Sequence, residues 1–139
     1  MTNHVLEKLL EALKENLDHL QEKKNLTLNQ YLNDWQERAI VERKLQLAIQ
    51  TAIDIGTRLI SHKKLTVPQN AKAIFKILLE NKLIAEELAE KLEDLVALRN
   101  ELVHEYREIE NDTVYSYLQK APPILKAFGE AIVNIAEQR

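Results

Sequence analysis

Glycine and proline are scarce in this chain, and their scarcity restricts the folds open to it. The 139 residues include 2 Gly and 3 Pro, whereas β-hairpin turns and phosphate-binding loops depend on glycine. There is also no cysteine, which excludes disulfide frameworks, thiolate metal sites and cysteine nucleophiles. The sequence therefore favours an all-helical protein that folds without covalent cross-links.

Length and charge narrow the range of functions. A chain of 139 residues is expected to form one domain, spanning residues 1–139, and can bury roughly two-thirds of the surface that it exposes when unfolded. With 19 Lys+Arg against 22 Asp+Glu the formal net charge is −3, which argues against a protein that holds nucleic acid by bulk charge. The sequence has no apolar run long enough to span a bilayer and no start typical of a signal peptide. A cytoplasmic protein without membrane contact is expected.

Apolar residues recur at three- and four-residue intervals, which is the periodicity of helices that bury one face. The segments that show it are residues 3–24, 28–61, 70–81, 84–106 and 113–138. An up-and-down bundle of four or five helices is therefore predicted.

Local signals add detail to this bundle. Thr27 followed by Gln30 fits a capping box at the start of the second segment. That segment carries two apolar seams, so it is expected to pack against more than one helix. Gly56 within it either permits close packing or marks a bend. Pro122 and Pro123 interrupt the last segment, where a kink or a restart is expected.

The fourth segment has an arginine where its apolar seam calls for a hydrophobic side chain. The seam consists of Leu88, Leu92, Leu95, Arg99, Leu102 and Tyr106. A guanidinium at this position is costly to desolvate unless it is paired or the seam faces a cleft or an interface. On its own, such an arginine is more typical of a partly buried structural ion pair.

A histidine follows this arginine five residues later. If the helix stayed straight to residue 106, Tyr106 would lie within about 20° of Arg99 and His104 about 140° away. Asn100 and His104, spaced i, i+4, would share a second face. Arg99 and His104 could then act on one atom only if the helix distorted near its end or a second copy supplied part of the site.

The string Arg-Asn-x-Leu-Val-His-x-Tyr over residues 99–106 resembles the motif of the HEPN superfamily. It is most similar to the HepT toxins, which pair with minimal nucleotidyltransferase antitoxins of the MntA type. The resemblance covers residues 31–137 and includes a segment, residues 38–55, that is similar to the family's second helix. It implies a HEPN bundle that forms a homodimer through its motif-bearing helices. It also implies a metal-independent ribonuclease toxin of a type II toxin–antitoxin system, which cleaves transfer or messenger RNA.

The residue types suit that chemistry. His104 titrates near neutral pH and can move the protons of RNA cleavage. The fork of Arg99 can hold the non-bridging oxygens of the phosphate, and Asn100 could orient either group. The resemblance further implies that the antitoxin transfers AMP to Tyr106. Added phosphates on the Arg99 side of the helix would then repel and block the RNA backbone.

Other signals are less specific. Arg58, Lys63 and Lys64, together with His62, form a small basic cluster that could contact RNA, although a solvated loop explains it at least as well. Glu101 and His104 match half of a di-iron motif, but the chain has no second Glu-x-x-His. No metal or cofactor is expected, and without a glycine-rich loop the chain should not bind ATP by itself.

Two further classes of function remain open at the level of sequence. The chain could be a non-catalytic bundle that binds a nucleotidyltransferase and presents a substrate or Tyr106 to it. It could also be a plain helical scaffold, which would show neither toxicity nor modification.

Overall fold

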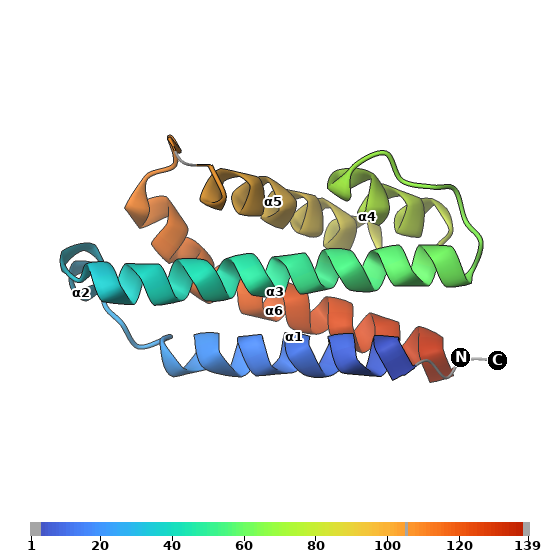
Figure 1. The fold of residues 1–139 in the computed structure, drawn as a ribbon, viewed down its shortest axis with the longest axis horizontal. Coiled ribbons are helices and arrows are strands. Elements are labelled where there is room, and N and C mark those ends of the chain that lie inside the picture. Colours follow the sequence, from blue (N-terminus) through green and yellow to red (C-terminus); the bar gives the residue numbers. More distant parts are fainter. Residues whose placement is uncertain (1–3, 105, 138–139) are drawn as a thin grey trace.

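The computed structural model describes residues 4–104 and 106–137, and every regular element in this part of the chain is a helix. The helices are α1 (His4–Glu22), α2 (Leu28–Asn33), α3 (Trp35–His62), α4 (Ala71–Glu80), α5 (Glu86–Leu102) and α6 (Asn111–Glu137). In Figure 1, α1 lies along one side of α3, and α4 and α5 lie along the other, while α6 contacts α1, α3 and α5. The predicted all-α bundle is confirmed, although the described residues form six helices where four or five were expected. None of the described helices is both long and apolar enough to cross a membrane.

The predicted second helix is in fact two helices, because Asp34 interrupts it. The capping box at its start is confirmed: Thr27 Oγ1 accepts a hydrogen bond from the Gln30 backbone, and the Gln30 side chain accepts one from the Thr27 backbone. Asp34, however, leaves the helical conformation with φ −127° and ψ 100°, and its carboxylate accepts from Gln36 N at 3.0 Å. An aspartate that bonds to nearby backbone N–H groups ends one helix and begins the next.

α3 is the central helix of the bundle. It packs against α1, α2, α4, α5 and α6, which confirms that its two apolar seams face different neighbours. A Cβ atom built on Gly56 would lie 2.5 Å from Cγ2 of Ile74 on α4. Gly56 therefore permits a close approach of α3 to α4, which decides between the two roles that the sequence allowed for it.

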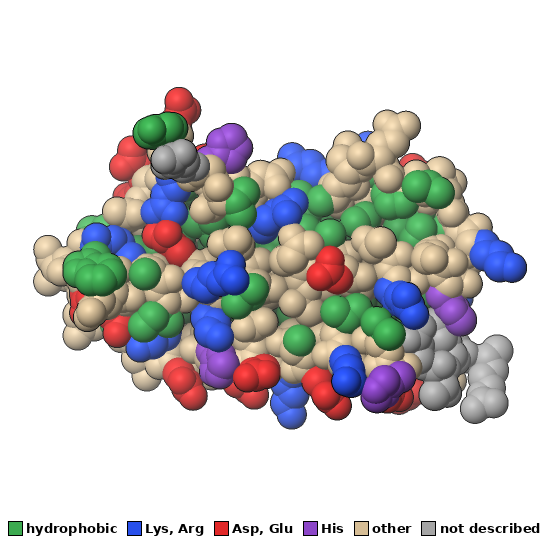
Figure 2. All heavy atoms as spheres, viewed as in Figure 1, with side chains coloured by type: hydrophobic (Ala, Val, Ile, Leu, Met, Phe, Trp, Pro, Cys, Tyr) green, Lys and Arg blue, Asp and Glu red, His purple; other side chains and the backbone are tan. Residues whose placement is uncertain are grey.

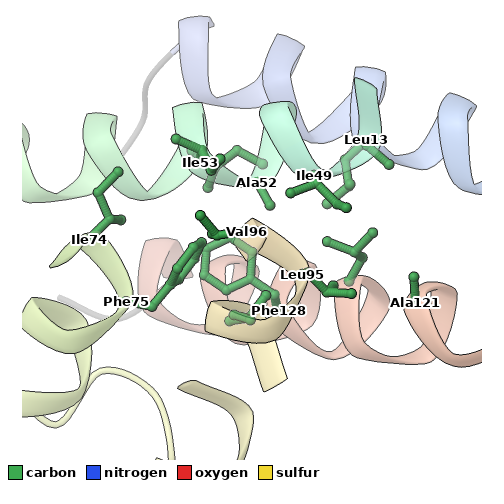
Figure 3. Close-up of a cluster of buried hydrophobic side chains, with 14 of the residues drawn as sticks. Leu13, Ile49, Ala52, Ile53, Ile74, Phe75, Leu95, Val96, Ala121 and Phe128 are labelled. Atoms are coloured by element: carbon green, nitrogen blue, oxygen red, sulfur yellow. The ribbon is translucent and has the colours of Figure 1, made fainter. Parts of the chain in front are cut away.

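The hydrophobic core lies between α3 and the helices α1, α4, α5 and α6 that pack around it. Figure 3 shows Ile49, Ala52 and Ile53 of α3 facing side chains from the other helices. Phe75 of α4 and Phe128 of α6 meet edge to face with their ring centroids 5.5 Å apart. Apart from the hydroxyl of Tyr31, the fully buried side chains that the structure describes are apolar, so the core is held together by apolar packing.

α6 runs as one helix through Pro122 and Pro123, so the restart that the two prolines allowed does not occur. Each proline removes one backbone hydrogen bond. α6 packs against α1, α2, α3 and α5, and Ala121 and Leu125 beside the prolines are buried. This packing holds the helix together where its own hydrogen bonds are missing.

Candidate functional site

Arg99 lies near the C-terminal end of α5, and its guanidinium reaches α3. Its Nη1 donates a hydrogen bond to Oε1 of Gln50 at 2.8 Å, and Nε2 of Gln50 donates to Oδ1 of Asp54 at 2.9 Å. Arg99 forms no ion pair with any residue that the structure describes. The arginine in the apolar seam is therefore held by a neutral amide, and it is not part of the structural ion pair that is typical of such a position.

Within the described part of the chain, the guanidinium of Arg99 retains an unpaired hydrogen-bond donor and an unpaired positive charge. Its Nε is buried and has no hydrogen-bond partner within residues 4–104 and 106–137. Buried N–H groups are paired in the great majority of cases. A neutral partner also leaves the positive charge of Arg99 uncompensated. The uncompensated charge favours an anionic ligand at this point.

A cavity of about 570 Å³ opens between α4 and the C-terminal half of α5. Its lining consists of Asn70, Ala71, Lys72, Ala73, Lys76, Glu93, Val96, Arg99 and Asn100. The structure thus brings Arg99 and Asn100 together on one wall. His104 is not part of this lining.

α5 ends earlier than the sequence predicts, and this changes the geometry of the motif. The helix ends at Leu102, with Val103 N bonded to Arg99 O and His104 N bonded to Glu101 O, both at 3.2 Å. His104 therefore lies exposed beyond the helix, and the angles calculated for a straight helix to residue 106 do not apply. The expectation that His104 and Asn100 share a helical face is wrong for the same reason.

Tyr106 also lies beyond the end of α5. Its side chain is 87% exposed, which is unusual for a large aromatic residue. The prediction that it extends the apolar seam on the Arg99 side of the helix is wrong, because the helix ends four residues before it. Its phenol is instead accessible to another molecule.

An ion pair that no local sequence signal predicts anchors the segment after α5. Arg107 Nη1 and Nη2 bond to Oε1 and Oε2 of Glu42 on α3 at 2.6 and 2.7 Å, and Nη2 also bonds to Asn111 at the start of α6. The hydrogen bonds that Arg107 donates to Glu42 raise the pKa of Arg107 above its usual value. Burial, with the charge of Glu42 as a second cause, raises the pKa of the nearby Tyr31 to about 12. No local sequence signal could have revealed a contact between residues 65 positions apart.

The basic cluster predicted to contact RNA lies at the C-terminal end of α3. Arg58, Lys63 and Lys64 are exposed near the end of α3 and in the loop that follows. Lys63 is 13 residues from Gln50, or about 20 Å along a helix axis. None of the three lines the cavity beside Arg99. The structure thus places Lys63 and Lys64 away from Gln50, the partner of Arg99, whereas Arg58 is about 12 Å from Gln50 along the helix axis.

No three His, Asp or Glu side chains within the described ranges are close enough to hold a metal ion. The pairing of Glu101 with His104 that a di-iron half-motif requires also lacks its helical frame, because His104 lies beyond the end of α5.

Comparison with known proteins places the chain in a family. A family model described as "Ribonuclease HepT-like" matches residues 8–132. A tRNA nuclease HepT of Aphanizomenon flos-aquae is 31% identical over 138 residues, which are 96% of this chain and 94% of that protein. An mRNA nuclease HepT of Shewanella oneidensis is 32% identical over 91 residues, which are 66% of this chain and 68% of that protein.

Solved structures agree with the sequence comparison. A tri-AMPylated HEPN toxin of Shewanella oneidensis, solved in complex with its MNT antitoxin, superposes with a TM-score of 0.88 at 26% identity. The match covers 96% of this chain and 99% of that chain. YutE, a cytosolic protein of unknown function from Bacillus subtilis, superposes with a TM-score of 0.77 at 25% identity. That match covers 95% of this chain and 88% of the YutE chain. The family model, the relatives and the shared fold together show that this chain belongs to the HepT-like ribonuclease family of the HEPN superfamily.

Proposed function

We propose that this chain is the ribonuclease toxin of a toxin–antitoxin pair and that it cleaves RNA with Arg99, Asn100 and His104, without a metal ion. The observation that carries the proposal is the state of Arg99, which Gln50 holds in place without neutralising it, in the wall of a cavity. The relatives named as nucleases and the solved toxin–antitoxin complex support the general class. Transfer RNA and messenger RNA are the two candidate substrates that the relatives' names offer.

The proposed reaction uses the ribose of the substrate as its nucleophile. The 2′-hydroxyl attacks the adjacent phosphorus, and the bond from phosphorus to the 5′-oxygen of the next nucleotide breaks. Arg99 stabilises the charge that builds on the non-bridging oxygens. His104 is exposed and can accept the proton of the 2′-hydroxyl or supply one to the leaving oxygen. Asn100, on the cavity wall beside Arg99, orients the phosphate.

Two copies of the chain would complete this site. His104 lies beyond the helix and outside the lining of the cavity that contains Arg99. Val103 and Tyr106, on either side of the histidine, are 51% and 87% exposed. A second copy packed against this end of α5 would cover those apolar side chains and add a second Arg99 and a second His104. The proposed partner in catalysis is therefore another copy of the same chain.

Tyr106 is the proposed site of neutralisation by a nucleotidyltransferase antitoxin. Its oxygen would attack the α-phosphorus of ATP, pyrophosphate would leave, and the hydroxyl proton would pass to solvent or to a base of the antitoxin. Each AMP unit adds a negative phosphate close to the end of α5, where it would repel an RNA backbone. The 87% exposure of Tyr106 supports access by a second protein.

Expression in a bacterial host tests the nuclease proposal. Wild-type protein should arrest growth and fragment cellular RNA, whereas Arg99→Ala and His104→Ala should be folded and harmless. Arg43→Ala on α3 and His4→Ala on α1 are matched controls, since both residues are exposed and lie outside the cavity, and both should remain toxic. Equal toxicity of wild type, Arg99→Ala and His104→Ala would reject the proposed site.

Mass spectrometry tests the neutralisation. Co-expression with the nucleotidyltransferase should add AMP to Tyr106 and remove toxicity, and Tyr106→Phe should stay toxic in its presence. Tyr117→Phe on α6 is the matched control and should still be neutralised. Modification of Tyr106 in a protein that never cleaves RNA would favour the non-catalytic presenting partner.

A further inference from the structure

The cavity beside Arg99 extends onto α4, where it meets a pair of lysines. Lys72 and Lys76 are spaced i, i+4 and both line the cavity, so their side chains start about 5–6 Å apart on one face of α4. Both are exposed, and neither forms an ion pair with any described residue. Their ammonium groups are therefore free to bind a ligand that enters beside Arg99.

The charge of this cavity contrasts with that of the whole protein. Its lining includes Lys72, Lys76 and Arg99 against a single carboxylate, Glu93, which gives a formal charge of 3 − 1 = +2 in a chain of net charge −3. Charges of one sign in a concave surface focus the potential felt by a ligand.

The second cavity of the described structure, about 850 Å³ between α1 and α6, has the opposite balance. It is lined by Glu11, Asp18 and Glu130 against Lys14 and Lys126, a formal charge of 2 − 3 = −1. Of these two cavities, only the one beside Arg99 combines a positive lining with a residue of the motif.

The start of α4 adds to this positive character. Asn70 and Ala73 line the cavity, and the Asn70 side chain accepts a hydrogen bond from Ala73 N at 2.9 Å. The N-terminal end of a helix carries a partial positive charge. This end of α4 borders the same cavity as the two lysines.

We propose that Lys72 and Lys76 bind the sugar–phosphate backbone of the RNA substrate next to the phosphate held by Arg99. This inference rests on the proposed nuclease function and specifies where the rest of the strand lies: it runs from Arg99 along the α4–α5 cavity. Lysines contact phosphates as point charges, without reading bases, so the subsite supplies affinity and register and is indifferent to sequence. The strand is placed away from Lys63 and Lys64.

Binding to a fluorescein-labelled single-stranded oligoribonucleotide of mixed sequence tests the subsite, in a His104→Ala background that prevents cleavage. For single strands, affinity falls with salt with a slope of about −0.7 per phosphate contact. Lys72→Gln/Lys76→Gln should therefore reduce the slope by about 1.4 and weaken binding about 25-fold at 0.1 M salt. Lys8→Gln/Lys14→Gln on α1, which makes no contact with α4, removes the same charge and should bind like the parent.

A second variant is expected to bind RNA more tightly, a result that misfolding could not produce. Glu93→Gln removes the one carboxylate of the cavity and should tighten binding about two- to fivefold, because a like charge beside the phosphates is removed. The proposal is overturned if Lys72→Gln/Lys76→Gln binds like the parent, if the α1 control loses as much affinity, or if the parent does not bind the oligonucleotide. Cleavage by protein with His104 intact is measured separately. Binding that depends on Lys72 and Lys76 without cleavage would reject the nuclease proposal and leave the subsite in place.

Discussion

Arg107 and Glu42 form a two-point ion pair that fastens the segment after α5 to α3. Both nitrogen–oxygen distances are below 2.8 Å, and the side chains are only 22% and 23% exposed. A paired fork fixes orientation as well as position. Tyr106 directly precedes Arg107, so the exposed tyrosine is presented from an anchored segment.

Breaking this ion pair should loosen the segment and lower stability. Glu42→Gln keeps the shape of the side chain but loses the charge, and we expect a loss of about 1–2 kcal/mol in the free energy of unfolding, between the values for exposed and buried pairs. Modification of Tyr106 should slow as well. Thermal denaturation and the rate of AMP addition are the measurements. Glu87→Gln, which breaks the exposed Glu87–Lys91 pair, should change neither noticeably; an equal effect of both variants would contradict the anchoring role.

Gln50 should matter for cleavage because it positions Arg99. Gln50→Leu removes the acceptor for Nη1, and hydrogen bonds to charged groups contribute about 1.5–3 kcal/mol. We therefore expect cleavage to fall about 10- to 100-fold, with unchanged circular dichroism. Gln46→Leu, one turn earlier on α3, is the control and should cleave normally. Full activity of Gln50→Leu would show that Arg99 needs no such support.

The two glycines should respond oppositely to alanine. In Gly56→Ala the new methyl group would lie 2.5 Å from Ile74 Cγ2, so the Ile74 side chain or the two helices must shift, at a cost of about 1–3 kcal/mol. In Gly129→Ala the nearest atom is Leu13 Cδ2 at 3.5 Å, an ordinary contact. The better helix propensity of alanine should then stabilise α6 by up to about 1 kcal/mol. Chemical denaturation of both variants measures the difference, and destabilisation by Gly129→Ala would contradict the packing described.

Tyr31 should make stability fall at alkaline pH. Its pKa is raised from 10.0 to about 12 by burial, so its contribution to stability is complete below pH 10 and is lost as the pH rises towards 12. Its hydroxyl has no partner among the described residues. Tyr31→Phe should therefore cost little at pH 7 and should remove part of the alkaline decline. The hydroxyl of Tyr115, by contrast, donates a hydrogen bond to Leu26 O. Tyr115→Phe should therefore lower the free energy of unfolding by about 1 kcal/mol at pH 7. A large loss in Tyr31→Phe at pH 7 would contradict this account.

Much of the fold could be predicted because it depends on local signals. Apolar periodicity predicts the helices, the capping box at Thr27 is confirmed, and so is the close packing that is one of the two roles expected of Gly56. Asp34 was missed because a single aspartate can either cap a helix or lie on its surface. Only the structure shows its carboxylate bonded to the backbone of the next turn.

The site was predictable in its parts but not in its arrangement. The position of Arg99 in an apolar seam marked it as unusual, yet nothing in the sequence identified Gln50 as its partner. The sequence also does not predict that α5 ends at Leu102. The Arg107–Glu42 pair that holds the following segment joins residues far apart in the chain. The pair Lys72 and Lys76 has a readable i, i+4 spacing, but only the packing of α4 on α5 brings it to the cavity of Arg99.

The most direct test of the central claim is the rate at which purified protein cleaves labelled transfer RNA and messenger RNA in the presence of EDTA. We predict cleavage by the wild type and a loss of at least about 100-fold in Arg99→Ala, as expected when a charged group that stabilises the transition state is removed. Arg43→Ala should cleave at the wild-type rate. No cleavage by the wild type under these conditions, or cleavage by Arg99→Ala at the wild-type rate, would contradict the account.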